Sequence, residues 1–128
     1  MKKLLLILLC FPLLTLAQQT YVPDDNFEGY LETHTAGGAV VTVGDANSMG
    51  NGIANDDYVT TANISGVTTL NVSFQNIADL TGIEDFIALT DLDCESNQLT
   101  SLDVTQNTAL TDLSCFQNQL TSLDVTQN

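Results

Sequence analysis

Residues 89–107 read LTDLDCESNQLTSLDVTQN, and residues 110–128 read LTDLSCFQNQLTSLDVTQN. The two stretches align at a period of 21 residues and differ at three positions, which are Asp93/Ser114, Glu95/Phe116 and Ser96/Gln117. A more divergent copy occupies residues 67–88 and keeps the apolar positions with a period of 22 residues. Such a period predicts stacked supersecondary units, because one copy cannot bury its apolar face alone.

Each copy contains a short stretch in which apolar and polar residues alternate. Leu92 and Cys94 alternate with acidic neighbours, which is the period-two pattern of a half-buried strand. Stacking the copies predicts a parallel sheet over a continuous leucine core, with one strand per copy. Leu102–Val104 and Leu123–Val125 are expected to form a second extended stretch, and residues 82–86 a short helical turn.

The pattern L-x-x-L-x-C-x-x-N-x-L-x-x-L-D-V-x-x-N resembles the leucine-rich repeat and is most similar to its 21-residue variant called IRREKO. The copy at 67–88 differs, and its run Ile77-x-x-Leu80-x-x-Ile83-x-x-Phe86-x-x-Leu89 resembles the internalin-type repeat. The resemblance covers residues 66–128. It implies a β-rich leucine-rich-repeat solenoid of the α/β repeat class, with short parallel strands stacked into a curved sheet.

Asparagines recur at fixed offsets in the copies. Asn97 and Asn118 follow the two expected strands, and Asn107 and Asn128 take a matching place at the second corner. Buried backbone groups at a turn need hydrogen-bond partners, and an amide side chain offers both donors and an acceptor. We interpret these four residues as a structural asparagine ladder, not as ligand-binding groups.

Residues 18–65 do not repeat, and they are expected to cap the amino-terminal end of the repeat core. A short helix should begin at residues 23–26, with Asp25 and Glu28 at the spacing of a capping box. Residues 36–56 are rich in Gly, Asn and Ser and predict a long loop around one strand, Ala39–Val43.

Residues 1–17 have the layout of a secretory signal peptide. Two lysines precede an apolar run, and Thr15-Leu16-Ala17 offers small residues for cleavage. The alternative, an uncleaved anchor, is disfavoured because the run is shorter than the roughly 20 apolar residues of a membrane helix. No second apolar stretch follows, so the sequence predicts an exported protein without a membrane span after cleavage.

The charge is one-sided after residue 17. Residues 18–128 contain no lysine or arginine, and all 16 acidic residues lie there. The sequence predicts no nucleic-acid binding, because that function needs a basic face. Docking on anionic lipid is disfavoured for the same reason. The acidic surface is either a solvated surface or a binding surface for divalent cations or a basic partner.

The side chains of the expected strands that point away from the leucine core form one surface, here called the inner face of the repeats. This face is the candidate binding surface. Two of the three differences between the regular copies fall on this face, although drift at exposed positions explains them equally well. A partner should carry positive charge or bring calcium, and Phe116 would anchor an apolar or sugar contact. The candidate ligand-binding residues are Asp91, Asp93, Glu95, Asp112, Ser114 and Phe116.

A calcium loop is the one cofactor site that the spacing suggests. Asp45, Asn47, Gly50 and Asp56 fit positions 1, 3, 6 and 12 of such a loop. Met49 at position 5 does not fit, so a turn rich in Gly and Asn is the alternative reading. The candidate metal ligands are Asp45, Asn47 and Asp56, and no other cofactor is expected.

The remaining reactive side chains have structural interpretations. Cys94 and Cys115 share one repeat position and should be small buried hydrophobes, with a disulfide as the alternative in an oxidising compartment. His34 is expected in a surface loop, and no nucleophile is placed with it by a recognisable motif. The sequence therefore predicts no enzyme activity.

These expectations combine into a non-catalytic recognition or adhesion module of a secreted or cell-surface bacterial protein, with a protein or glycan ligand. The alternatives are a structural or calcium-stabilised spacer within a longer surface protein, or an accessory domain of an enzyme. The expected divisions are 1–17, 18–65 and 66–128, the last with copies at 67–88, 89–109 and 110–128. The final copy stops two residues short of its period without a cap, so we expect a fragment of a longer protein.

Overall fold

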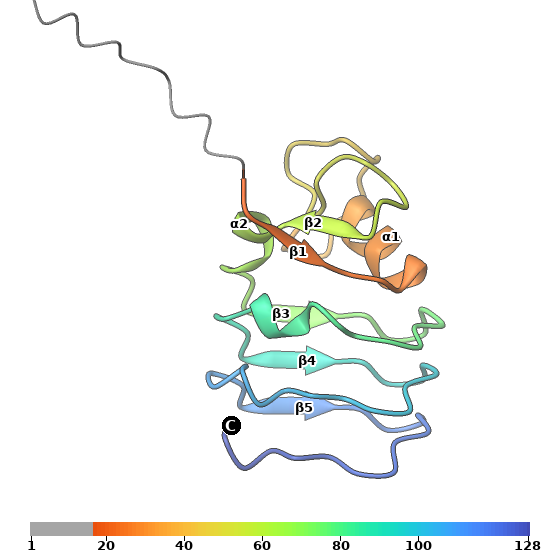
Figure 1. Ribbon diagram of the computed structural model, residues 1–128, viewed down its shortest axis with the longest axis vertical. Coiled ribbons are helices and arrows are strands. Elements are labelled where there is room, and N and C mark those ends of the chain that lie inside the picture. The colour runs from red at the N-terminus through yellow and green to blue at the C-terminus, as the bar shows by residue number, and fades with distance from the viewer. Residues whose placement is uncertain (1–16) are drawn as a thin grey trace, which may run out of the picture.

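The computed structural model describes residues 17–128. The predicted signal peptide lies outside the described residues, apart from Ala17. The elements in chain order are β1 (Gln19–Tyr21), α1 (Asp25–Thr33), β2 (Tyr58–Thr60), α2 (Thr61–Ile64), β3 (Thr69–Asn71), the 3₁₀ turn η1 (Ile83–Asp85), β4 (Asp91–Asp93) and β5 (Asp112–Ser114). In Figure 1, β3, β4 and β5 lie one beside the next, and α1 with the β1–β2 pair lies at the amino-terminal end of this row.

The repeats form one parallel sheet in the order β3-β4-β5. Leu70 pairs with Leu92 and Leu92 with Leu113, so the register steps by the same 22 and 21 residues as the sequence. The hydrogen bonds continue past the strand ends, where Val72 N–H donates to Asp93 O and Cys94 N–H donates to Ser114 O, each at 2.8 Å. The prediction of one parallel strand per copy is confirmed. At the second corner, where an extended stretch was expected, Asp103 and Asp124 form a single parallel bridge.

The apolar core is continuous between the repeats and the amino-terminal part of the chain. Phe27 of α1 stacks on Phe86 of the first copy, with ring centroids 6.3 Å apart. Buried aromatic pairs at this separation add to the stability that burial of apolar area provides. The buried residues along the repeats are Val67, Leu70, Val72, Ile77, Leu80, Ile83, Phe86, Leu89, Leu92, Cys94, Leu99, Leu102, Val104 and Leu110.

The N-cap of helix α1 is one residue earlier in the sequence than the Asp25 that the predicted capping box would use. Its N-cap is Asp24, whose Oδ1 accepts hydrogen bonds from the backbone N–H groups of Asn26 and Phe27. The other oxygen, Oδ2, accepts from the N–H groups of Ala78 and Asp79 in the first copy. The prediction that Asp25 caps the helix with Glu28 is therefore wrong, since one carboxylate caps the helix and also ties it to the repeats.

The strand predicted at Ala39–Val43 is absent. Val40 makes only an isolated bridge with His34 and is 77% exposed. The β-branched run has no neighbouring strand with which to form a ladder, and the loop is instead held by turn hydrogen bonds such as Gly38 N–H to Thr35 O. The strand pair that does form is β1 with β2, antiparallel, with Thr20 opposite Val59.

The first copy differs from the others at its returning segment. The predicted helical turn there is η1, and its N-cap Gly82 has a φ of 103°. A Cβ at this position would lie 2.8 Å from Val22 Cγ2 and 2.9 Å from Tyr21 O. Glycine therefore permits both the left-handed backbone and the close contact between the first copy and β1. Among residues 17–128, no helix has the length and apolar character to cross a membrane.

Candidate functional site

The inner face consists of the outward side chains of the repeat strands and of the residues directly after them. The leucines of β3 and β4 point into the core, whereas the alternate residues are partly or fully exposed. A hollow of about 310 Å³ lies over this face and is lined by residues of all three strands. The inner-face residues are Thr69, Asn71, Ser73, Asp91, Asp93, Glu95, Asp112, Ser114 and Phe116.

The acidic side chains of the inner face are oriented by neighbouring hydroxyl and amide groups. Asp91 and Asp112 are register partners on β4 and β5. The Thr90 hydroxyl donates to Asp91 Oδ2 at 2.6 Å, and the Thr111 hydroxyl donates to Asp112 Oδ2 at 3.0 Å. Like charges on adjacent strands repel, so these threonines help hold the carboxylates on this surface.

Asp93 and Glu95 complete the acidic group of the inner face. Asp93 Oδ2 accepts from Asn71 Nδ2 at 3.3 Å, across from β3. Glu95 Oε2 accepts from the Ser114 hydroxyl at 3.4 Å, across toward β5. The structure thus brings the six sequence-predicted ligand-binding residues onto one surface that spans two adjacent strands and their ends.

Two exposed phenylalanines lie just beyond the carboxyl ends of the strands. Phe116, which the sequence singled out, is 58% exposed, and Phe74, which it did not, is 66% exposed. Phe74 has a φ of 59°, like Ser96 and Gln117 at the same place in the next copies. The left-handed conformation costs a side chain with a Cβ about 1–2 kcal/mol. At the 22-residue period used above, Phe74 aligns with the polar turn residues Ser96 and Gln117, so the repeat pattern gave no signal for an exposed aromatic residue there.

The side-chain amides of the recurring asparagines bond to the backbone of neighbouring copies. Asn97 Oδ1 accepts from Gln75 N–H (3.1 Å) and Ile77 N–H (3.0 Å), and its Nδ2 donates to Val72 O (2.8 Å). Asn118 Nδ2 donates to Cys94 O at 2.9 Å, in the preceding copy. These amides face the turn backbone and not the hollow.

The second corner has its own pair of asparagines. Asn107 Nδ2 donates to Ile83 O at 2.8 Å and to Phe86 O at 3.2 Å. Asn128 Nδ2 donates to Val104 O at 2.9 Å and to Asn107 O at 2.8 Å. Within the described part of the chain, the buried Asn107 Oδ1 has no hydrogen-bond partner.

The candidate calcium ligands hold the turns in which they occur. Asp45 Oδ1 accepts from the backbone N–H and the side-chain amide of Asn47, at 2.8 and 3.0 Å. The Asp56 carboxylate accepts from Asn51 Nδ2 at 3.1 Å. These contacts are those of a turn rich in Gly and Asn, and the calcium assignment stays a prediction.

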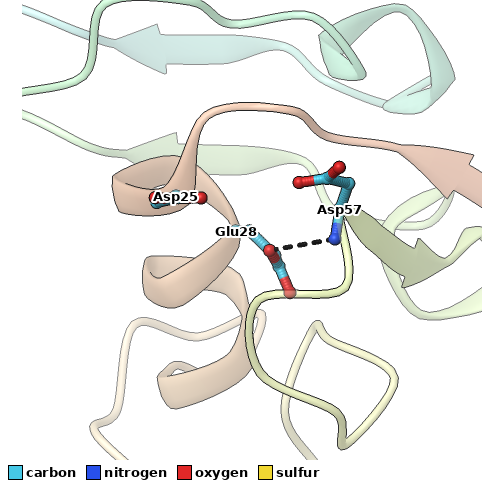
Figure 2. A group of neighbouring side chains, drawn as sticks. All are labelled: Asp25, Glu28 and Asp57. Carbon is cyan, nitrogen blue, oxygen red and sulfur yellow. Dashed lines mark hydrogen bonds between the residues drawn. The ribbon is translucent and has the colours of Figure 1, made fainter.

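A different acidic cluster lies beside α1. Asp25, Glu28 and Asp57 have carboxylate oxygens within 4.8 Å of one another (Figure 2). Glu28 is buried, and its two oxygens accept hydrogen bonds from Asp56 N–H (3.1 Å) and Asp57 N–H (3.2 Å). The sequence analysis assigned Asp25 and Glu28 to helix capping, whereas Glu28 instead anchors the loop that precedes β2.

The pKa of Glu28 is raised above its usual 4.5, chiefly because burial removes water from the carboxylate. A raised pKa in the folded state means that the folded protein binds this proton more tightly than the unfolded chain. Glu28 therefore contributes added stability below pH 4.5, and this contribution falls as the pH rises through the folded pKa.

Glu28→Gln removes the titration of this side chain. We expect the melting temperature of the wild type relative to Glu28→Gln to fall as the pH rises through this window, and a pH-independent difference would contradict the assignment.

The two cysteines are free thiols, one buried and one half-buried. Burial, with Cys115 and Asp93 nearby, raises the pKa of Cys94 to about 12. A thiol with such a pKa is not a nucleophile at neutral pH. The reading of Cys94 as a small buried hydrophobe is confirmed, and the alternative disulfide does not form.

His34 is not the surface-loop residue that the sequence suggested. It ends α1 as the C-cap and is half-buried. Its ring stacks on Tyr30 with centroids 3.9 Å apart, and Nδ1 lies 2.9 Å from Tyr30 O. The imidazole is therefore part of the packing at the end of the helix.

Comparison with known proteins places the fold. No protein-family profile matches the chain. Internalin J of Listeria monocytogenes serotype 4b is 46% identical over 52 residues, which are 41% of this chain and 6% of that protein. The structure of the functional domain of internalin J from Listeria monocytogenes has a TM-score of 0.63 and 36% identity, over 87% of this chain and 22% of that chain.

A second solved structure agrees with the first. Internalin C2 of Listeria monocytogenes 4b has a TM-score of 0.60 and 26% identity, over 84% of this chain and 43% of that chain. The chain thus spans less than half the length of each of these proteins. The likeness in fold to both structures covers more than four fifths of this chain. In sequence and in fold, this chain is an internalin-like leucine-rich-repeat protein.

Proposed function

We propose that the chain is a non-catalytic recognition module whose inner face binds a protein or a glycan. The observation that carries the proposal is the uncovered face of the β3–β5 sheet, with its hollow of about 310 Å³. The core and asparagine positions of the two regular copies are identical, and two of their three differences, Asp93/Ser114 and Glu95/Phe116, lie on this face, while the third is at the turn. A scaffold with a variable surface has this distribution of changes.

The context of the module is part of the same proposal. Residues 1–17 direct export, residues 18–65 cap the repeats, and residues 66–128 form a short solenoid. One of the matched structures is described as including a cysteine ladder. Cys94 and Cys115, at one position of adjacent copies, would be two rungs of such a ladder, which stabilises the repeats as packed apolar groups.

Binding to immobilised glycans and to immobilised extracellular proteins tests this function. The inner-face variant is Asp91→Asn/Asp93→Asn/Glu95→Gln/Phe116→Ala. The matched control is Asp79→Asn/Glu84→Gln/Asp103→Asn/Ile87→Ala, which removes the same number of charges and one exposed apolar side chain. Asp79, Glu84 and Asp103 line a separate hollow of about 320 Å³ that shares no residue with the inner face.

We expect the wild type and the control variant to bind the same immobilised ligand, and the inner-face variant to lose that binding. The physical reason is that a recognition surface concentrates its binding energy in a few central residues. Equal binding by all three proteins would overturn the proposal and favour a structural spacer. Circular dichroism of each variant shows whether the fold is kept.

A further inference from the structure

The inner face carries negative charge, and residues 18–128 contain no lysine or arginine that could balance it. Four carboxylates, those of Asp91, Asp93, Glu95 and Asp112, lie on two adjacent strands and their ends. No lysine or arginine occurs after residue 3. This face therefore attracts a cationic partner. Electrostatic complementarity of this kind affects both the choice of partner and the association rate.

The carboxylates are spread along the face and do not converge on one point. Among the described residues, the group of acidic side chains close enough to hold a single metal ion is Asp25, Glu28 and Asp57, none of which is on the inner face. One oxygen each of Asp91 and Asp112, and both oxygens of Asp93, already accept a hydrogen bond from the chain itself. This arrangement suits several separate cationic groups better than one divalent cation.

The hollow over the strands has a continuation toward the amino-terminal loop. A second hollow of about 180 Å³ is lined by Tyr30, residues 35–38 and Met49, and it shares Thr69, Leu70 and Asn71 with the first. The two together form a groove that crosses the strands from the loop to β5. Neighbouring strands are about 4.8 Å apart and an extended chain rises about 3.3 Å per residue, so the groove takes an extended segment of roughly four to six residues.

The exposed phenylalanines lie in the loops directly after two of the strands that line this groove. Phe74 follows β3 and Phe116 follows β5, and the loops that carry them are joined by Phe74 N–H to Glu95 O (3.2 Å) and Ser96 N–H to Phe116 O (3.0 Å). Aromatic faces attract cations, and arginine more often than lysine, because the planar guanidinium also stacks on the ring. A neutral glycan would gain from the rings but not from the carboxylates.

We propose that the inner-face groove binds an extended, arginine-containing segment of a partner protein, with guanidinium groups paired to Asp91, Asp93 and Asp112 and stacked on Phe74 and Phe116. The inference rests on the proposed function, because it names the partner class for the same face. The segment crosses the strands, so that successive basic side chains meet carboxylates of successive copies.

Fluorescence anisotropy with labelled (Arg-Ser)₅, (Lys-Ser)₅ and (Glu-Ser)₅ peptides tests the inference on the protein produced from the full chain. The variants are Asp91→Asn/Asp93→Asn/Asp112→Asn and, as a control of equal charge change, Asp79→Asn/Glu84→Gln/Asp103→Asn. We expect the inner-face variant to bind (Arg-Ser)₅ about tenfold more weakly than the wild type, the control to change by less than about twofold, and (Glu-Ser)₅ not to bind. An equal loss in both variants would show attraction to net charge alone and would overturn the inference.

A second pair of variants tests the aromatic contacts. Phe74→Asn/Phe116→Ala keeps a residue that tolerates the left-handed backbone at position 74, and Ile87→Ala removes an exposed apolar side chain elsewhere. The wild type should bind (Arg-Ser)₅ more tightly than (Lys-Ser)₅, and the double variant should lose this preference while Ile87→Ala keeps it. An unchanged preference would remove the phenylalanines from the site.

The two proposals fail in different ways. If the inner-face variant no longer binds the immobilised ligand but both triple variants bind (Arg-Ser)₅ with the same affinity, the inner face remains the recognition surface and the assignment of a basic segment as its partner is wrong. If binding of the immobilised ligand does not depend on the inner face, the proposed function itself is wrong.

Discussion

Asn97→Ala is expected to lower the free energy of unfolding by about 4 kcal/mol. The Asn97 side chain is 8% exposed and accepts from the part-buried backbone N–H of Gln75 and the buried N–H of Ile77. It also donates to Val72 O and Cys94 O. Alanine satisfies none of these groups, and each buried group without a partner costs about 1–3 kcal/mol.

Urea unfolding followed by circular dichroism measures this loss. Gln98→Ala is the control, because the neighbouring side chain is exposed. Asn118→Ala should cost less than Asn97→Ala, because Asn118 is only partly buried and its Oδ1 accepts from one N–H, that of Leu99. If Asn97→Ala and Gln98→Ala had equal stability, the asparagine would not hold the turns of adjacent copies together.

Glu32→Ala is expected to cost about 3 kcal/mol and to release the loop after residue 48. Glu32 is fully buried in α1, and its carboxylate accepts from the N–H groups of Asn51 and Gly52. Hydrogen bonds to a charged group are worth about 1.5–3 kcal/mol each, and here they are the partners of a carboxylate removed from water. Gly50 packs directly on this carboxylate, where a Cβ would clash with the Glu32 side chain.

Hydrogen exchange of the backbone amides checks this second prediction. In Glu32→Ala the amides of residues 51 and 52 should exchange much faster than in the wild type, while those of β4 keep their protection. Asp25→Ala is the control, since Asp25 is an exposed acid on the same helix. Unchanged protection at residues 51 and 52 would show that another contact holds the loop.

The repeat part of the fold was predictable because its pattern is local and periodic. The alternation around Leu92 and the identical offset of Leu113 determine which residues face the core, and the pairing of strands follows from the period. The same alternation places Asp91, Asp93 and Asp112 on the opposite face. A register shift of one residue would have exchanged the two faces. The repeat period therefore determines both which residues form the core and which form the candidate surface.

The amino-terminal part was less predictable because its contacts are long-range. Asp24 caps α1 and also bonds to the first copy, more than fifty residues away in sequence. Val40 looked like part of a strand, but tertiary structure provides it with no ladder. Buried glutamates that bind loop N–H groups leave no local pattern, which is why Glu28 was assigned to helix capping and Glu32 was missed. Phe74 was missed because the matching residues of the regular copies, Ser96 and Gln117, are polar turn residues.

The location of the bound basic segment tests the account's central claim most directly. Hydrogen exchange read by mass spectrometry, with and without saturating (Arg-Ser)₅, reports which parts of this internalin-like chain the peptide covers. The account predicts slower exchange in residues 69–75, 91–97 and 112–118, which form the inner face and its edge. Slower exchange confined to residues 79–84 and 101–106, around the separate hollow, would contradict it.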